Sequence, residues 1–326
     1  MKGFPMTDNR QTSPFPYHIP PTAAQTEEEL EYAILFRDYI HELLKELSFR
    51  YAKDDLFDVY PAKYRPRGFR DKTPVWLIWW QGEDKMPDLV KLCVNSIRHA
   101  IPGDLAEIYF ITEANFRDYV HFPPRILELF QKGSITITHL TDLIRAELLY
   151  RYGGFYIDAT FLVRQPMPKQ WFLPDAFYTP KLDPPDPQFV SQGLWFGNFI
   201  KTGAGDILPR YLINAFYLYW SEQEILADYF LIDIIIAEAV RSVPAIADKI
   251  LGNPPSMPHI EHLVHNLNDP YDEAVDRILQ EDTFVYKLTW KLPFEKQTPD
   301  GRETLYGHIC REIEKNGDIV AHGREE

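Results

Sequence analysis

Apolar runs separated by polar, glycine-containing and proline-containing segments divide the middle of the chain into alternating strands and helices. The continuous apolar run at 74–80, closed by Gln81 and Gly82, is typical of a buried parallel strand. A second strand is predicted over 107–112, with a helix over 91–100 between the two. Strands that alternate with helices indicate an α/β fold with a parallel sheet, whose ligands lie at the carboxyl ends of the strands.

The next segment combines a helix, a glycine pair and a strand with a lone acid. Residues 141–152 contain neither glycine nor proline and begin with an N-cap candidate, which predicts a helix. The glycine pair at 153–154 provides the positive φ angles that end a helix. The aromatic and β-branched composition of 155–163 predicts a buried strand. Because side chains alternate along a strand, Asp158 and Thr160 should point to the same side.

Two charged residues of this helix add to the strand's acid. Asp142 and Arg145 are three residues apart and share one helical face. An arginine beside separated acids suits an anionic, metal-bound ligand such as a nucleotide diphosphate. The alternative is a surface ion pair between Asp142 and Arg145, with Asp158 capping a turn.

The remaining elements are predicted from the same patterns. Helices are predicted over 27–51, 125–132, 210–220, 221–240, 259–267 and 271–280, and strands over 134–138, 194–200 and 283–291.

Two acids, Asp228 and Asp233, fall on the apolar 221–240 helix, for which Ser221 and Glu224 form a capping box. Unpaired carboxylates there would cost several kcal/mol, so we expect them to line an acceptor groove or to pair with an arginine.

The patterns divide the chain into three parts. We expect an N-terminal extension with one helix (1–72), an α/β domain (73–295) and a polar C-terminal tail (296–326). Within the extension, the proline-containing residues 1–25 are predicted to be a loose arm.

Composition narrows the class of protein. A formal net charge of −14 argues against a nucleic-acid partner. Two cysteines are too few for a disulfide framework or a zinc site and indicate ordinary thiols in a reducing compartment. With no signal peptide and no apolar run near the roughly twenty residues of a membrane span, we expect a cytoplasmic protein. A local basic patch would still allow peripheral association with a membrane glycan-assembly complex at the inner face.

At this point the residues match a known family. The central stretch resembles the Asp-x-Asp sugar-binding region of glycosyltransferase family 32, and stands here as Thr141-Asp142, Arg145, Leu149-Tyr150, Gly153-Gly154, Tyr156 and Asp158-Ala159-Thr160. Further motifs, in the same order, look like the capsular polysaccharide synthesis branch of that family: Ile78-Trp79-Trp80-Gln81-Gly82, Ile111-Thr112-Glu113-Ala114-Asn115-Phe116, Asp228-Tyr229-Phe230 and Lys287-Leu288-Thr289-Trp290-Lys291. The similarity covers about residues 73–291.

The resemblance implies a GT-A-like fold with a mixed, mostly parallel sheet and additional helices. It further implies transfer of a hexose-like sugar, with retention, from a nucleotide-diphosphate donor, with a UDP-type donor favoured, to a glycan acceptor. Carried over by position, Asp158, Arg145 and Asp142 would be the catalytic residues, and Asp158 with Thr160 would bind Mn²⁺ or Mg²⁺. The donor-binding positions implied are Trp80, Gln81, Gly82, Gly153, Gly154, Lys287 and Trp290.

Several of these assignments have an alternative. Thr160 stands where the family usually has a second acid, although the capsular branch resembles this chain in having Asp-Ala-Thr. A neutral hydroxyl is a weaker ligand for Mg²⁺ or Mn²⁺ than a carboxylate, so the metal would depend on the nucleotide or be dispensable. Lys287 and Trp290 would close over the phosphates, or be a surface lysine and a core tryptophan. Trp80 competes with its neighbours, because the three tryptophans of 76–80 cannot all line a pocket.

Two other functions fit the same residues. One is a toxin-like or effector-like transferase that modifies a protein hydroxyl from the same donor site. The other is a non-catalytic sugar-nucleotide-binding protein with a degenerate site, which Thr160 suggests.

Overall fold

A four-stranded mixed sheet lies at the centre of the computed structural model, which describes residues 27–322 without 60–65, 69–70 and 187–188. The strand order is β2-β1-β3-β5. β1 (Thr73–Ile78) is parallel to both β2 (Ala106–Ile111) and β3 (Gly154–Ile157), and β5 (Phe199–Thr202) is antiparallel to β3. The expected α/β class with a mixed, mostly parallel sheet is therefore confirmed.

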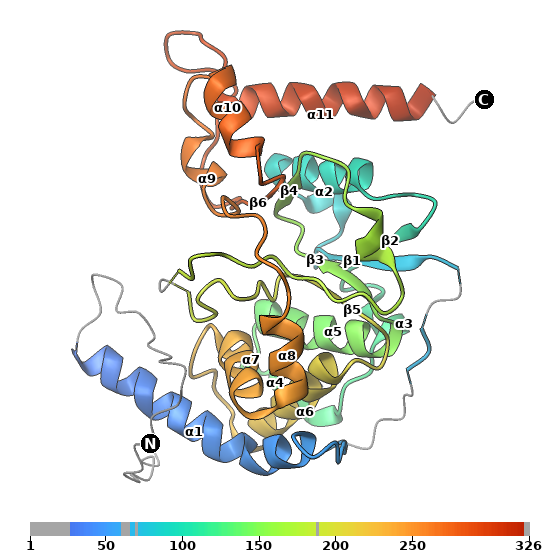
Figure 1. The fold of residues 1–326 in the computed structure, drawn as a ribbon, viewed down its shortest axis with the longest axis vertical. Helices are drawn as coiled ribbons and strands as arrows, with labels where there is room; N and C mark the ends of the chain where they lie inside the picture. The colour runs from blue at the N-terminus through green and yellow to red at the C-terminus, as the bar shows by residue number, and fades with distance from the viewer. Residues whose placement is uncertain (1–26, 60–65, 69–70, 187–188, 323–326) are drawn as a thin grey trace.

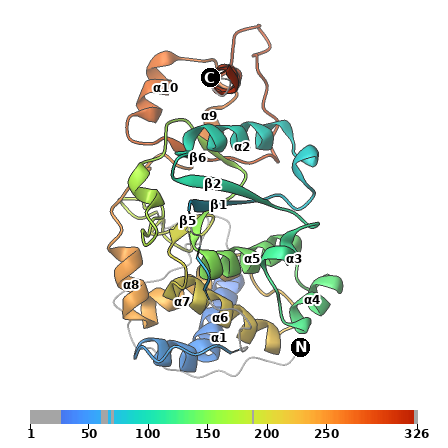
Figure 2. The ribbon, with the colours of Figure 1, turned by 90° about the vertical axis from the view of Figure 1, so that its right-hand side faces the viewer.

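Both faces of the sheet are covered by helices, which explains the uninterrupted apolar run of β1. Val75 and Leu77 pack towards α2 (Asp88–Ala100), whereas Trp76 and Ile78 pack towards α5 (Ile137–Tyr152). Beyond α5 lies a further layer of helices (Figure 2), made of α1 (Glu27–Tyr51), α6 (Ile207–Glu222), α7 (Leu231–Ser242) and α8 (Pro244–Leu251). The helix of the N-terminal extension thus packs on the body of the protein, against α6 and α7.

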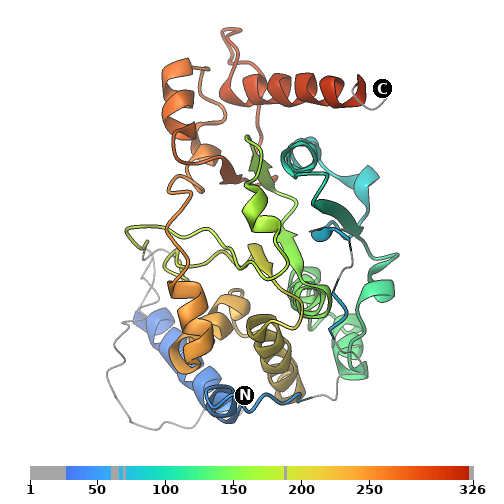
Figure 3. The same cartoon turned by 45° about the vertical axis from the view of Figure 1, so that its right-hand side comes forward.

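The C-terminal part of the described chain lies on the other side of the sheet, next to α2 (Figures 1 and 3). It is attached through a small antiparallel pair of strands, β4 (Phe161–Val163) and β6 (Val285–Lys287). α9 (Leu263–Asn266), α10 (Glu273–Gln280) and α11 (Leu305–His322) complete it, and α11 packs against α2. The short elements between the main ones are η1 (Glu83–Lys85), α3 (Phe116–Tyr119), α4 (Pro124–Gln131) and η2 (Lys169–Phe172).

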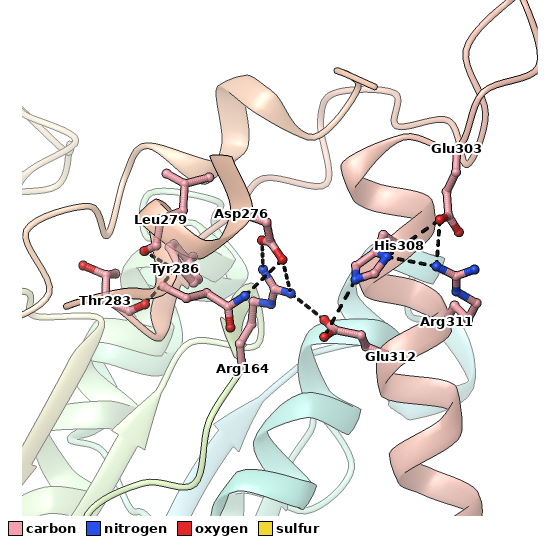
Figure 4. A network of polar contacts seen from close by, with 10 residues as sticks. Arg164, Asp276, Leu279, Thr283, Tyr286, Glu303, His308, Arg311 and Glu312 are labelled. Atoms are coloured by element: carbon pink, nitrogen blue, oxygen red, sulfur yellow. Dashed lines mark hydrogen bonds and ion pairs between the residues drawn. The ribbon is translucent and has the colours of Figure 1, made fainter. Parts of the chain in front are cut away.

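A buried arginine connects this C-terminal part to β4 (Figure 4). Arg164 follows β4 directly and its side chain is only 2% exposed. Its guanidinium pairs with both oxygens of Asp276 on α10 and with Glu312 on α11. Three elements that are far apart in the sequence therefore share one charge cluster.

The predicted strands over 194–200 and 283–291 and the predicted helix over 259–267 differ in their bounds from β5, β6 and α9. Three further predicted elements differ more strongly. The strand predicted over 134–138 is wrong, because Thr136 is the N-cap of α5 and its hydroxyl accepts a hydrogen bond from the His139 backbone. The strand over 155–163 is divided into β3 and β4 by a turn at Asp158. The helix over 221–240 begins only at Leu231.

The predicted capping box at the start of that helix is also wrong. Ser221 donates instead to the carbonyl of Leu218 in α6, and Glu224 pairs with Arg125. The segment expected as a polar tail contains α11, whose buried side chains include Leu305, Ile309 and Ile313.

Three further predictions concern the thiols, the membrane and the arm. Cys93 and Cys310 are both buried free thiols, as expected. None of the helices described is long and apolar enough to cross a membrane. The arm predicted over 1–25 lies outside the described residues.

Candidate active site

The turn between β3 and β4 presents the central acid of the site. The Asp158 backbone N–H donates to Asn198 O at 2.9 Å, and Phe161 N–H donates to Asp158 O at 3.0 Å. Thr160 donates twice to Asp158 Oδ1, from its backbone N–H at 2.9 Å and from its hydroxyl at 2.6 Å. The Asp158 side chain remains 34% exposed, so the turn holds a carboxylate that a ligand can reach.

The lysine expected to close over the phosphates lies directly beside this turn. Lys287 Nζ is 3.5 Å from Asp158 Oδ1 and donates a hydrogen bond to the Thr160 hydroxyl. Burial raises the pKa of Asp158, but the Lys287 charge and the two Thr160 hydrogen bonds outweigh it, so that the pKa lies below its ordinary value. Asp158 is therefore ionised at neutral pH, and Asp158, Thr160 and Lys287 form one cluster.

Asp142 and Arg145 form a buried ion pair on α5, with side chains 6% and 9% exposed. Arg145 also donates to the carbonyl of Gly197, and its guanidinium lies 4.5 Å from the centre of the Tyr156 ring. Burial lowers the pKa of Arg145, but the negative charges around it, Asp142 foremost, raise the pKa by more. The surface-pair interpretation is therefore wrong, because both charges have been removed from water.

Asp233 lies next to this pair on α7. Trp195 Nε1 donates to Asp233 Oδ1 at 2.9 Å. A side-chain carbon built at Gly197 would lie 3.8 Å from Asp233 Oδ1 and 3.5 Å from Arg145 Nη1, so the two charged groups flank the same glycine. Burial raises the pKa of Asp233 to about 6, although Trp195 and Arg145 oppose the shift.

Asp228 occupies the loop before α7 rather than the helix itself. Its Oδ1 accepts from the Phe230 backbone N–H at 2.7 Å. Burial raises the pKa of Asp228, against the effect of that hydrogen bond and of the Arg37 and His139 charges. Tyr229 and Phe230, the next two residues, are 59% and 51% exposed. The structure thus places Asp228 beside an exposed aromatic pair.

Gly153 and Gly154 are not brought to this cluster. They lie at the start of β3, about 13 Å from Asp158 by the rise of a strand. Their φ angles of 68° and 98° are left-handed, and a side-chain carbon at Gly154 would lie 2.2 Å from the carbonyl oxygen of Pro74. These glycines shape the helix-to-strand connection; their assignment to donor binding stays untested.

The tryptophans expected to contact the nucleotide-sugar donor differ in how exposed they are. The Trp80 side chain is 7% exposed, and its ring packs 5.1 Å from that of Phe116, centre to centre. Gln81 is exposed, and Gly82 is the half-buried N-cap of η1, with a φ of 93°. Trp290 is 48% exposed, and its ring lies 6.2 Å from that of the half-buried Trp79. Among the tryptophans of the quoted motifs, Trp79 and Trp290 are therefore more accessible than Trp80.

Two residues near the cluster, Asn198 and Glu261, were missed by sequence reasoning. Trp79 belongs to a quoted motif, but the sequence alone does not favour it over Trp80. Asn198 holds the Asp158 backbone, and its buried Oδ1 has no hydrogen-bond partner among the described residues. Glu261 is half-buried; burial raises its pKa, and the nearby Lys287 charge opposes the shift. Neither Asn198 nor Glu261 stands in a spacing that would have indicated a site.

The cluster does not fit a divalent cation. The side chains in contact at the turn provide one carboxylate and one neutral hydroxyl, beside the Lys287 ammonium, whereas Mg²⁺ and Mn²⁺ favour several oxygen ligands. Within the described ranges no group of three or more His, Cys, Asp or Glu side chains is placed to hold a metal. An ammonium about 4 Å from a dication would add about 8 kcal/mol of repulsion, twice the value for two unit charges near a protein surface. The sequence-based expectation of Mn²⁺ or Mg²⁺ at Asp158 and Thr160 stays untested.

The chain has partial similarity to known proteins. The chain is 26% identical over 174 residues to "Glycosyltransferase afumC" of Aspergillus fumigatus, a match that covers 48% of this chain and only 43% of that relative. Among solved structures, "PaToxG Glycosyltransferase" aligns with 12% identity and a TM-score of 0.34, over 78% of this chain and 99% of that chain.

A family model described as capsular polysaccharide synthesis protein matches residues 37–309, which is most of the chain. The chain therefore belongs to the capsular polysaccharide synthesis protein family, a glycosyltransferase-like family.

Proposed function

We propose that this protein transfers a hexose-like sugar from a UDP-type nucleotide donor to a glycan acceptor in the assembly of a capsular or other surface polysaccharide. The observation that carries the proposal is the gathering of Asp158, Thr160 and Lys287 in one accessible cluster at the carboxyl end of β3. The carboxyl ends of parallel strands are where α/β proteins bind their ligands. A GT-A-like donor site at this position agrees with the family of the chain.

Each charged group has a task in this proposal. Lys287 offsets the negative charge that develops on the leaving diphosphate, which is the main electrostatic requirement of the reaction. Asp158, which is ionised, orients Lys287 and accepts a hydrogen bond from a donor hydroxyl. Asp142 holds the Arg145 guanidinium in place, so that this rigid cation defines the floor of the sugar site.

The aromatic pair, Asp228 before α7 and Asp233 on α7 fill the remaining roles. Trp79 and Trp290 border the nucleobase, a role better suited to them than to the buried Trp80. Asp228 and Asp233 line the acceptor side, where carboxylates bind sugar hydroxyls.

The sequence offers no obvious carboxylate nucleophile at the reacting carbon. We therefore propose attack by the acceptor hydroxyl on the same face that the nucleotide leaves, which retains the anomeric configuration. The reaction takes place on the cytoplasmic side, at the inner face of the membrane.

The test is hydrolysis and transfer from a panel of radiolabelled nucleotide sugars. Wild-type protein should release nucleoside diphosphate from one of them, and Asp158→Asn should reduce the rate by about a hundredfold, as expected for loss of one preorganised polar group. The matched control is Asp88→Asn, whose side chain is 93% exposed and whose replacement should change nothing.

The destination of the label separates the alternatives. Label that appears in a glycan supports the proposal, whereas label on a protein band would select the protein-modifying transferase. Nucleotide binding without any turnover of the panel would select the non-catalytic binding protein.

A further inference from the structure

The Lys287 ammonium lies at the position where a cation would have to bridge the two polar side chains of the turn. It contacts Asp158 Oδ1 at 3.5 Å and the Thr160 hydroxyl by a direct hydrogen bond. The Thr160 proton is already donated to Asp158 at 2.6 Å, so the Thr160 oxygen is left to accept from Lys287. Both side chains of the turn are therefore arranged around an ammonium.

The charges of this cluster balance without a metal. Asp158 contributes −1, Thr160 contributes 0 and Lys287 contributes +1, which sum to zero. A second carboxylate at position 160 would leave a net negative charge that attracts a dication. With Thr160 and Lys287 the cluster gives no such attraction, and its one cation is covalently part of the chain.

The position of Lys287 is fixed by backbone pairing and not by a flexible loop. It is paired with Phe161 in the β4–β6 ladder, and its N–H donates to Ile260 O at 2.7 Å. The next residue, Leu288, donates to Thr160 O at 3.0 Å. The backbone of Lys287 is thus held against the same turn that its ammonium contacts, which fixes the charge before any ligand arrives.

The ammonium also remains available to a ligand. The Lys287 side chain is 23% exposed, and two of the three hydrogen bonds of its ammonium, to Asp158 Oδ1 and to Leu288 O, are long at 3.5 Å. Lysine binds phosphate as a point charge and can turn its three N–H groups towards oxygens on either side. A diphosphate oxygen beside the turn would replace the long contacts with short charge-assisted ones.

We propose that Lys287 takes the place of a divalent cation in this site, so that the protein binds its nucleoside diphosphate without metal. The inference rests on the proposed function, because it assigns the cation that faces the donor diphosphate. It departs from the metal dependence that the family resemblance implies.

The test is isothermal titration of the full chain with UDP and with GDP, first in excess EDTA and then with added Mn²⁺ or Mg²⁺. Wild-type protein should bind one of the two nucleotides in EDTA, with an affinity that added metal leaves unchanged. Lys287→Met should weaken this binding roughly 10- to 100-fold, the range for hydrogen bonds to charged groups. Lys287→Arg keeps the positive charge and should therefore weaken nucleotide binding less than Lys287→Met does.

The control variant is Lys45→Met, which removes a 63%-exposed lysine on α1 and should bind like the wild type. Wild-type binding that appears only with Mn²⁺ or Mg²⁺ would overturn the inference while leaving the proposed function standing. Unchanged affinity of Lys287→Met in EDTA would also overturn it. If neither nucleotide binds under any condition, the proposed function fails and the inference fails with it.

Discussion

Each charge in the site is compensated in a different way. Asp158 is stabilised by a cation and two hydrogen bonds, and its pKa is lowered. Asp233 accepts only a neutral indole N–H within its surroundings as described, and its pKa is raised to about 6. In the proposed site the two carboxylates would therefore be suited to different tasks, Asp158 to hold charge at neutral pH and Asp233 to exchange a proton.

Replacing Asp233 by Asn should stabilise the protein at neutral pH. The pKa of Asp233 rises from 3.8 to about 6 on folding, so the folded state binds this proton more tightly than the unfolded state. The stabilisation that this proton gives is complete at a pH below 3.8, the pKa in the unfolded state. It is lost as the pH rises through about 6, the pKa in the folded state. A pKa difference of about two between the folded and unfolded states corresponds to at most about 3 kcal/mol of folding free energy.

Urea unfolding of the wild type and of Asp233→Asn across this pH range measures the effect. The difference in free energy of unfolding should grow in favour of the variant from about pH 4 to about pH 6 and then stay constant. Exposed Asp88→Asn should show no such trend. If the difference in free energy of unfolding between the two proteins did not depend on pH, the raised pKa of Asp233 would be contradicted.

At the scale of elements, the connection between α5 and β3 places three residues of the candidate site. α5 carries Asp142 and Arg145, and β3 leads to Asp158. The glycines between them let the chain reverse within two residues, with Gly154 directly against Pro74 of β1. The relative position of the arginine and the acid therefore depends on this close approach of two backbones.

Gly154→Ala should cost several kcal/mol of folding free energy. Its φ of 98° is strained for a residue with a side chain, and the new carbon would lie 2.2 Å from a backbone oxygen that cannot move freely. The matched control is Gly103→Ala, where no atom lies within 4 Å and φ is not left-handed. That variant should be neutral or slightly stabilising. Equal unfolding free energies for the two variants would contradict the role of Gly154.

The elements that could be predicted from sequence are those decided by local patterns. The apolar run of β1 and the glycine end of α5 are of this kind. The turn that ends β3 was not predicted, because the Asn198 carbonyl that holds it is 40 positions away. The sequence pattern predicts helix for the loop before α7. The loop is held instead by the Tyr219 hydroxyl, which donates to Ile225 O at 2.9 Å and accepts from Ala227 N at 3.0 Å, and these side-chain contacts leave no periodic pattern in the sequence.

At the scale of the whole molecule, the C-terminal part contributes a residue to the site and is tied to the body by Arg164 (Figure 4). The motifs suggested Lys287 as a donor contact. Its contact with Thr160 and its place in the β4–β6 ladder did not follow from sequence, because the paired residues of these strands are 122 to 126 positions apart and such pairing has no local signature. The arginine cluster was missed for the same reason.

Arg164→Met should loosen α10 and α11 and destabilise the protein by about 3–5 kcal/mol, since it leaves the buried Asp276 without its cation. Hydrogen exchange should rise first in α10 and α11. Arg311→Met removes a 50%-exposed arginine that pairs with Glu303 on the surface, and it should cost less than about 1 kcal/mol. Exchange that rises uniformly over the chain would argue against a specific link.

The pairing of β4 with β6 also sets an order of events during synthesis. Asp158 and Thr160 leave the ribosome well before Lys287, because 127 residues separate the turn from β6. Until β6 pairs with β4, the growing chain carries the acid without its cation. A nascent chain can therefore form most of its central sheet while it is still unable to bind the donor in the proposed way. Nucleotide affinity would then appear only when folding is complete.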